Sequence, residues 1–295
     1  MAAPTRTMYD PELVTDLFNK VRGKSTLARL SAQNGMPFNG TEEFIFTMDK
    51  DVDIVAENGK YSAGGMEFEP VKMVPIKFEY NARVPKEFQY ASEEKRINYL
   101  KAFNEGFAAK LAKGFDIAAM HGYNPRKGSA SEVVGTNHFD EKVKDKVVYA
   151  AGTVDDNLDA AIRMVTEHDG DVTGIAMSRT LASDMSKIKA NGVTVYPEFR
   201  FGGVPSALNG MAVDANTTVS KGPTGTLDHA IVGDFQNAFK WGFGKNISFE
   251  VIPYGDPDNT GVDLAGSGQV CLRSEAFLGW GILAPEYFAL VQATM

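Results

Sequence analysis

One segment, residues 92–121, limits what this chain can fold into. Ser92 is a favourable N-cap, Glu93 and Glu94 complement the positive end of a helix, and Gly122 begins the stretch that ends it. Apolar residues recur at steps of three and four, as on one face of a helix: Ile97, Leu100, Phe103, Phe107, Leu111, Phe115 and Ala118. At 1.5 Å per residue such a helix is about 45 Å long. We expect it to form a spine to which the other parts attach.

Residues 43–84 show a different pattern, that of a long two-stranded hairpin. Apolar and polar residues alternate over 44–56 and again over 71–80, and the glycine-rich segment 57–65 (ENGKYSAGG) between them predicts a flexible tip. An isolated hairpin is only marginally stable in water. The hairpin therefore needs a surface to lie on, either in this chain or on a neighbouring subunit.

The remaining segments mix helices and strands. A short helix is expected before Gly23, and a turn-rich linker at 31–40. From residue 147 onward the patterns favour helices at 155–168 and 178–190, and strands at 172–177, 193–199, 211–213, 229–232, 247–252, 270–283 and 286–291. These elements predict an α+β fold.

Composition excludes several classes of protein. A net charge of −8 disfavours a general grip on nucleic acid, which needs a basic surface. The single cysteine, Cys271, rules out an internal disulfide framework and fits a reducing compartment. No apolar run reaches membrane-spanning length, and the first residues lack the apolar stretch of a signal peptide. We expect a soluble protein folded in a cytoplasm, with no membrane partner.

No motif assembles a catalytic, cofactor or metal site. Residues 23–26 (GKST) resemble the end of a phosphate-binding loop, but Phe18 stands where that motif needs its first glycine, so a helix end is favoured. The four histidines have no metal-ligand spacing, and His121 and His168 are expected to be structural residues at helix ends. Cys271 lies in an apolar run and is expected to be buried. We therefore predict no catalytic residue, no cofactor and no metal, and no enzyme.

The order of these parts resembles the major capsid (head) protein family of tailed double-stranded-DNA bacteriophages, over nearly the whole chain. Three pieces carry the resemblance: the hairpin text VDIVAENGKYSAGGMEFEP at 52–70 followed by 71–84, the spine end FDIAAMHG at 115–122, and the strands LNGMAV at 208–213 and AIVGDF at 230–235. Their order and spacing matter more than any one of them.

The resemblance implies an N-terminal arm (1–41), an extended loop (42–83), a peripheral domain (84–150 and 253–295) with spine helix 92–121, and an α/β axial domain (151–252). Such subunits assemble through hexamers and pentamers into an icosahedral head around double-stranded DNA, in the host bacterial cytoplasm. Scaffolding, portal and decoration proteins are the further partners that it implies. We expect five residues at subunit interfaces: Lys60, Tyr61, Met66, Phe68 and Arg83.

Two departures from the family pattern lead to further expectations. The arm starts almost at Met1, so we expect any scaffolding protein to be a separate chain. Some members join a loop lysine to an asparagine with the help of a glutamate; here Lys60 and Glu275 match, but Ser267, Gly268 and Gln269 stand where the asparagine belongs. We therefore expect no covalent cross-link. Two alternatives remain: a bacterial nanocompartment shell protein of the same fold, and an unrecognised α/β enzyme.

Overall fold

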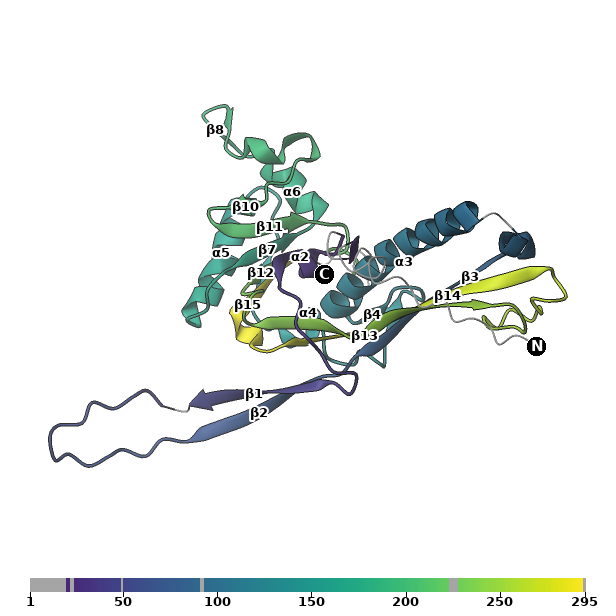
Figure 1. The fold of residues 1–295 in the computed structure, drawn as a ribbon. Helices are drawn as coiled ribbons and strands as arrows, with labels where there is room; N and C mark the ends of the chain where they lie inside the picture. The colour runs from purple at the N-terminus through teal and green to yellow at the C-terminus, as the bar shows by residue number, and fades with distance from the viewer. Residues whose placement is uncertain (1–19, 22–23, 49, 91–92, 223–227, 294–295) are drawn as a thin grey trace.

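The computed structural model describes residues 20–21, 24–48, 50–90, 93–222 and 228–293. Figure 1 shows a six-stranded sheet with its helices, a three-stranded sheet beside the long helix α3, and a thin hairpin that projects away from both. This mixed architecture confirms the predicted α+β fold with a spine helix and an extended loop. In the part of the chain that is described, no helix is long and apolar enough to cross a membrane.

Helix α3 (Glu93–His121) is the predicted spine, and its 29 residues match the expected extent almost residue for residue. Ser92, the predicted N-cap, lies outside the described residues. The C-terminal half is buried, and the Phe115 ring packs edge-on against Trp280 at 5.7 Å between centroids. Gly122 ends the helix at φ +70°, where a Cβ would stand 2.4 Å from the His138 ring, so only glycine fits.

The three-stranded sheet lies along the spine and supplies the largest side chains of its core. Strand β14 (Gln269–Ile282) pairs antiparallel with β13 (Phe239–Ile252) on one side and with β3 (Ile76–Pro85) on the other. Trp241 of β13 and Trp280 of β14 are both buried against Phe115. Cys271 is buried in β14, as predicted.

The hairpin is shorter than predicted. Strand β1 (Thr41–Met48) pairs with β2 (Met66–Met73), and no strand is formed by residues 50–65, so the expected strand at 52–56 is wrong. Strand β3, expected to continue the hairpin, instead pairs with β14. Pro75 lies between β2 and β3 and has no N–H to donate to a ladder, which separates the two strands. The segment 42–83 thus includes part of the three-stranded sheet.

The six-stranded sheet has the order β10-β11-β7-β12-β15-β6. Its strands are β6 (Lys146–Val148), β7 (Gly174–Met177), β10 (Ala207–Leu208), β11 (Met211–Ala215), β12 (Asp228–Gly233) and β15 (Phe288–Gln292). Helices α5 (Val154–Glu167) and α6 (Arg179–Met185) pack with Ile175 and Val232, whereas α2 (Thr26–Leu30) packs with Ala176 and Ile231. Because neighbouring residues of a strand point to opposite faces, the helices cover both sides of this sheet.

Several short elements complete the fold. Helix α4 spans Phe139–Lys142, and the small strands are β4 (Tyr123–Asn124), β5 (Ser129–Ala130), β8 (Lys189–Ala190) and β9 (Val193–Thr194). The 3₁₀ turns are η1 (Lys86–Tyr90), η2 (Pro197–Gly202) and η3 (Pro285–Tyr287).

The predictions of a helix to residue 190 and a strand at 193–199 are wrong. Helix α6 ends at Met185, and β8 and β9 form a hairpin closed by Asn191 and Gly192 at φ +51° and +84°. An Asn-Gly pair favours this left-handed turn, a signal that outweighs the apolar spacing around it.

Two strands cross the predicted domain boundaries. β13 falls inside the predicted axial range 151–252 but pairs in the three-stranded sheet, and β15 falls inside the peripheral range 253–295 but pairs with β12 and β6. Strand pairing joins residues far apart in the chain, so sequence ranges alone do not reveal it. The division into domains itself stays a prediction, and the predicted helix before Gly23 lies mostly outside the described residues.

Candidate assembly surfaces and a buried polar junction

The hairpin carries apolar residues that the described part of the chain leaves largely exposed. Its ladder pairs Phe44 with Pro70, and two further apolar pairs follow at alternate positions, Phe46–Phe68 and Met48–Met66. Alternate positions share one face of a strand, so the three pairs define a row of apolar positions on one face of the ladder. Phe44 is 58% exposed and Met66 is 50% exposed. Exposed apolar rows of this kind mark surfaces that bind another protein.

The predicted interface residues do not form one site. Lys60 and Tyr61 lie on the extended tip, where Tyr61 is 94% exposed, and Met66 lies at the base of that tip on β2. Phe68 is placed on β2 by its pairing, but its side chain lies outside what the structure describes. Arg83 lies apart from all of them, on β3. Their contact with a neighbouring subunit stays a prediction.

Arg83 binds a loop of its own chain. Its guanidinium donates to both carboxylate oxygens of Asp258, to Asp256 Oδ1 at 2.7 Å and to the Val262 carbonyl at 3.0 Å. The side-chain hydrogen bond to Asp258 raises the pKa of Arg83, and the same bond lowers the pKa of Asp258. The acidic turn at 256–258 therefore already holds a cation, the arginine itself.

We predict that Arg83→Ala loosens the loop 254–268 without unfolding the protein. The loop loses the donors that bridge its two aspartates to β3, whereas Val270 and Cys271 keep β14 in the core. Limited proteolysis and amide hydrogen exchange check this: cleavage and exchange rise within the loop only. Lys77→Ala on the same strand, which removes ion pairs with Glu79 and Glu275 and touches no residue of the loop in the interactions described, serves as the control and leaves the loop protected.

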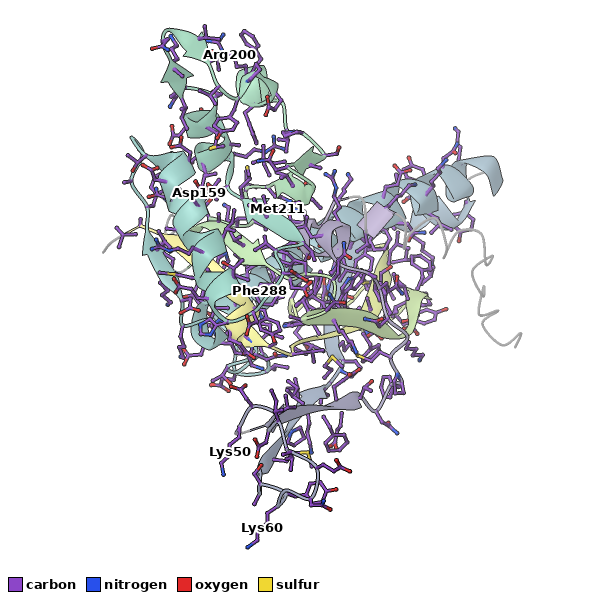
Figure 2. The ribbon with its side chains drawn as sticks, turned by 90° about the vertical axis from the view of Figure 1, so that its left-hand side faces the viewer. Lys50, Lys60, Asp159, Arg200, Met211 and Phe288 are labelled. Carbon is purple, nitrogen blue, oxygen red and sulfur yellow. The ribbon has the colours of Figure 1, made fainter. Side chains whose placement is uncertain are left out.

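A second exposed surface lies at the far end of the molecule. Figure 2 shows Lys60 at one end and Arg200 at the other. Next to Arg200, Phe201 is fully exposed and has φ +56°, a left-handed conformation that is strained for a bulky residue. The sequence analysis did not single out Phe201; the available signal is an aromatic residue directly before two glycines.

A network of buried polar groups joins the spine to the N-terminal helix. Asp116 of α3 accepts hydrogen bonds from Ser25 Oγ at 2.5 Å, Thr26 N at 3.0 Å, Leu27 N at 3.3 Å and Thr218 Oγ1 at 3.1 Å. Burial raises the pKa of Asp116 to about 6, although these hydrogen bonds oppose the shift. Asp116 thus holds the first turn of α2 against the spine.

This arrangement also explains the GKST segment. Ser25 is the N-cap of α2 and accepts a hydrogen bond from Ala28 N, so a new helix begins here, just after the helical residues 20–21 and the turn at Lys24. Thr26 Oγ1 donates to Asp214 of β11 at 2.6 Å. The first-turn N–H groups of Thr26 and Leu27, which a phosphate would need, are bound by the Asp116 carboxylate, so a nucleotide site is ruled out here.

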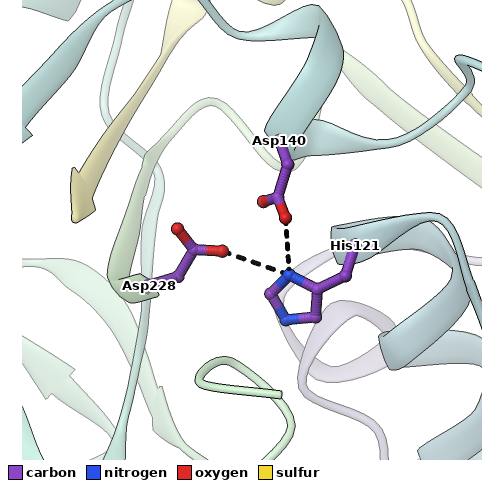
Figure 3. A group of neighbouring side chains, drawn as sticks. All are labelled: His121, Asp140 and Asp228. Atoms are coloured by element: carbon purple, nitrogen blue, oxygen red, sulfur yellow. Dashed lines mark hydrogen bonds and ion pairs between the residues drawn. The ribbon is translucent and has the colours of Figure 1, made fainter. Parts of the chain in front are cut away.

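A second buried group lies at the end of the spine. Figure 3 shows His121 of α3 facing Asp140 of α4 and Asp228 of β12. His121 Nδ1 lies 2.8 Å from Asp140 Oδ2 and 3.1 Å from Asp228 Oδ2, and Nε2 lies 3.0 Å from the Thr218 carbonyl oxygen. Gln292 Nε2 donates to Asp228 Oδ1 at 2.6 Å. The cluster ties α3, α4, β12 and β15 together.

The charges of this cluster shift every pKa in it. Burial alone would lower the pKa of His121, but the hydrogen bonds and charges of Asp140 and Asp228 outweigh it and raise the pKa to about 10. Burial raises the pKa of Asp140 to about 6, whereas for Asp228 the bond to His121 outweighs burial and lowers the pKa. The sequence predicted a structural His121 at a helix end, and it missed both aspartates, which are distant in the chain.

The fold, with an exposed apolar hairpin projecting from it, is that of a subunit suited to a larger assembly. The chain belongs to the phage capsid family, whose model matches residues 7–293. It is therefore a phage capsid protein, which associates with copies of itself to form the virion capsid. No curated protein sequence matches it.

Solved structures of phage proteins share the fold. A chain of Mycobacterium phage Ogopogo is 28% identical, with a TM-score of 0.77 and 92% of each chain covered. A chain of Gordonia phage Cozz is 21% identical, with a TM-score of 0.75, and the match covers 92% of this chain and 87% of that one. The capsid of a native GTA particle, computed with C5 symmetry, matches at 13% identity and a TM-score of 0.62 over 100% and 95% of the chains.

Proposed function

We propose that the protein assembles through hexamers and pentamers into an icosahedral phage head that encloses double-stranded DNA and performs no catalysis. The observation that carries this proposal is the apolar row on the hairpin, with Phe44 and Met66 half exposed and Tyr61 almost fully exposed. A neighbouring copy is the natural cover, because a closed shell presents each hairpin to the next subunit. Large interfaces of that kind supply contacts that one subunit lacks.

The interior of the shell would confine DNA by geometry more than by binding. A net charge of −8 disfavours a strong overall electrostatic attraction to DNA. Exposed lysines do occur on the spine, at Lys101, Lys110 and Lys113, and they are the candidates for weak contact with phosphates. We further propose assembly in the host bacterial cytoplasm, with a separate scaffolding protein, a portal protein and a decoration protein as partners.

The content of the particles tests this proposal against the nanocompartment alternative. Particles purified from infected cells are treated with nuclease and then opened. We expect protected double-stranded DNA, and no stoichiometric enzyme inside the shell. Shells that hold an enzyme and no DNA would favour the nanocompartment function, which has the same fold.

We predict that mature particles dissociate into single chains in hot denaturant. Glu275, the residue that would promote a cross-link, pairs with Lys77 at 2.6 Å, and Gly268 offers no side chain for a lysine to join. A denaturing gel checks this, with one band expected near 32 kDa. A ladder of higher bands that survives reducing agent would contradict it.

A further inference from the structure

We propose that His121, Asp140 and Asp228 form a site for a single divalent transition-metal ion, with Zn²⁺ as the best-suited probe. The three side chains come from α3, α4 and β12, and one ligand atom of each lies within 4.8 Å of the others. A neutral imidazole with two carboxylates is a donor set that zinc accepts. Figure 3 shows the three groups converging on one point.

The orientation of His121 leaves one ring nitrogen for the ion. Nε2 faces the Thr218 carbonyl at 3.0 Å, and a carbonyl can only accept, so Nε2 carries a proton. Nδ1 then points at the two carboxylates. A carbonyl on the far nitrogen of a histidine is the usual device that fixes a metal ligand, and Gln292 holds Asp228 in a comparable way.

Two carboxylate oxygens of the cluster accept no well-aligned hydrogen bond. Asp140 Oδ1 and Asp228 Oδ2 are both buried, and Asp228 Oδ2 has only the ion-pair contact with His121 Nδ1 at 3.1 Å. A proton on Nδ1 can align with only one carboxylate oxygen at a time, and it leaves the buried cluster with a net charge of about −1, which is unfavourable. A dication in place of that proton brings the net charge of the cluster to about zero, and the carboxylate oxygens can coordinate it.

The surroundings leave room for the ion and a way in. Gly222 borders the cluster, and a Cβ there would lie 3.5 Å from His121 Nδ1 and 3.9 Å from Asp140 Oδ2. The Asp140 side chain is 18% exposed, so the cluster lies close to the surface on that side. Ligands of a tetrahedral zinc lie about 3.4 Å apart, so the observed separations of 2.8 and 3.1 Å need to widen by about 0.6 and 0.3 Å.

Zinc binding to the purified, metal-stripped chain tests the proposal. We expect one Zn²⁺ per chain by elemental analysis, and an affinity that rises up to about tenfold per pH unit between pH 7 and 9, because the ion displaces the Nδ1 proton. Asp140→Asn keeps the size of the side chain and is expected to weaken zinc binding on the order of 100-fold. Asp145→Asn is the matched control: it removes the carboxylate of an exposed pair with His168 and leaves zinc binding unchanged.

A second measurement needs no variant. A chelator is expected to lower the melting temperature of the zinc-loaded wild-type chain, and zinc is expected to restore it. The proposal is overturned if the wild-type chain takes up no more zinc than Asp140→Asn, or if chelator and zinc both leave its melting temperature unchanged. The cluster then holds a proton only.

Discussion

Replacing the exposed apolar residues of the hairpin, Phe44→Asp with Met66→Asp, is expected to abolish particle formation and leave a folded free subunit. Both side chains are at least half exposed in the described part of the chain and lie on one face of the hairpin ladder. Each apolar side chain would contribute about 2 kcal/mol to the free energy of subunit association when buried on a neighbour. Burying an unpaired carboxylate in its place costs more than that contribution. Because every subunit of a closed shell makes the same hairpin contact, this loss of association free energy recurs at each of them. Sedimentation and electron microscopy measure the fraction of protein in particles.

The control for this experiment is Asp51→Asn, at an exposed site on the same extended loop. The aspartate and asparagine side chains are nearly equal in size. The substitution removes a charge but no apolar contact, so particles are expected at the wild-type yield. Far-ultraviolet circular dichroism of the double variant should match the wild type, because the hairpin adds little to the core. Wild-type yields of particles from the double variant would contradict the role of the apolar row.

Asp116→Ala is expected to reduce the free energy of unfolding of the subunit on the order of 4 kcal/mol. The substitution leaves four buried donors without an acceptor: Ser25 Oγ, the N–H groups of Thr26 and Leu27, and Thr218 Oγ1. Each unpaired buried group costs about 1–3 kcal/mol, reduced where local rearrangement admits water. Denaturant unfolding of the unassembled subunit provides the measurement.

The matched control is Asp159→Ala on the exposed face of α5, expected to change stability by less than about 0.5 kcal/mol. In Asp116→Ala, hydrogen exchange should rise first in α2, because Asp116 binds the first turn of that helix. Equal stability of the two variants would show that the network around Asp116 does not hold α2 to the spine.

Local patterns were enough to predict the elements whose signals lie within one segment. The spine extends from Glu93 to His121 because its apolar spacing and its glycine stop agree with each other. The hairpin was recognised from alternation around a glycine-rich tip. Its true length was missed, because Pro75 and the pairing of β3 with β14 depend on a partner about 190 residues away.

The buried polar groups lay beyond what the sequence reveals. Asp116 meets Ser25 across 91 residues, and His121 meets Asp228 across more than 100, so no spacing rule brings them together. The family resemblance singled out the segment 115–122, which contains both Asp116 and His121. Only the fold shows that Asp116 binds the first turn of helix α2 and that His121 lies beside the carboxylates of Asp140 and Asp228.

The central claim is that the uncovered hairpin is completed by another copy of the chain in a closed shell. A cryo-electron microscopy reconstruction of particles formed by the wild-type protein tests it most directly. We predict an icosahedral shell in which Phe44 and Met66 are buried against a neighbouring subunit. Isolated subunits under all assembly conditions, or a shell whose hairpins stand free in solvent, would contradict it.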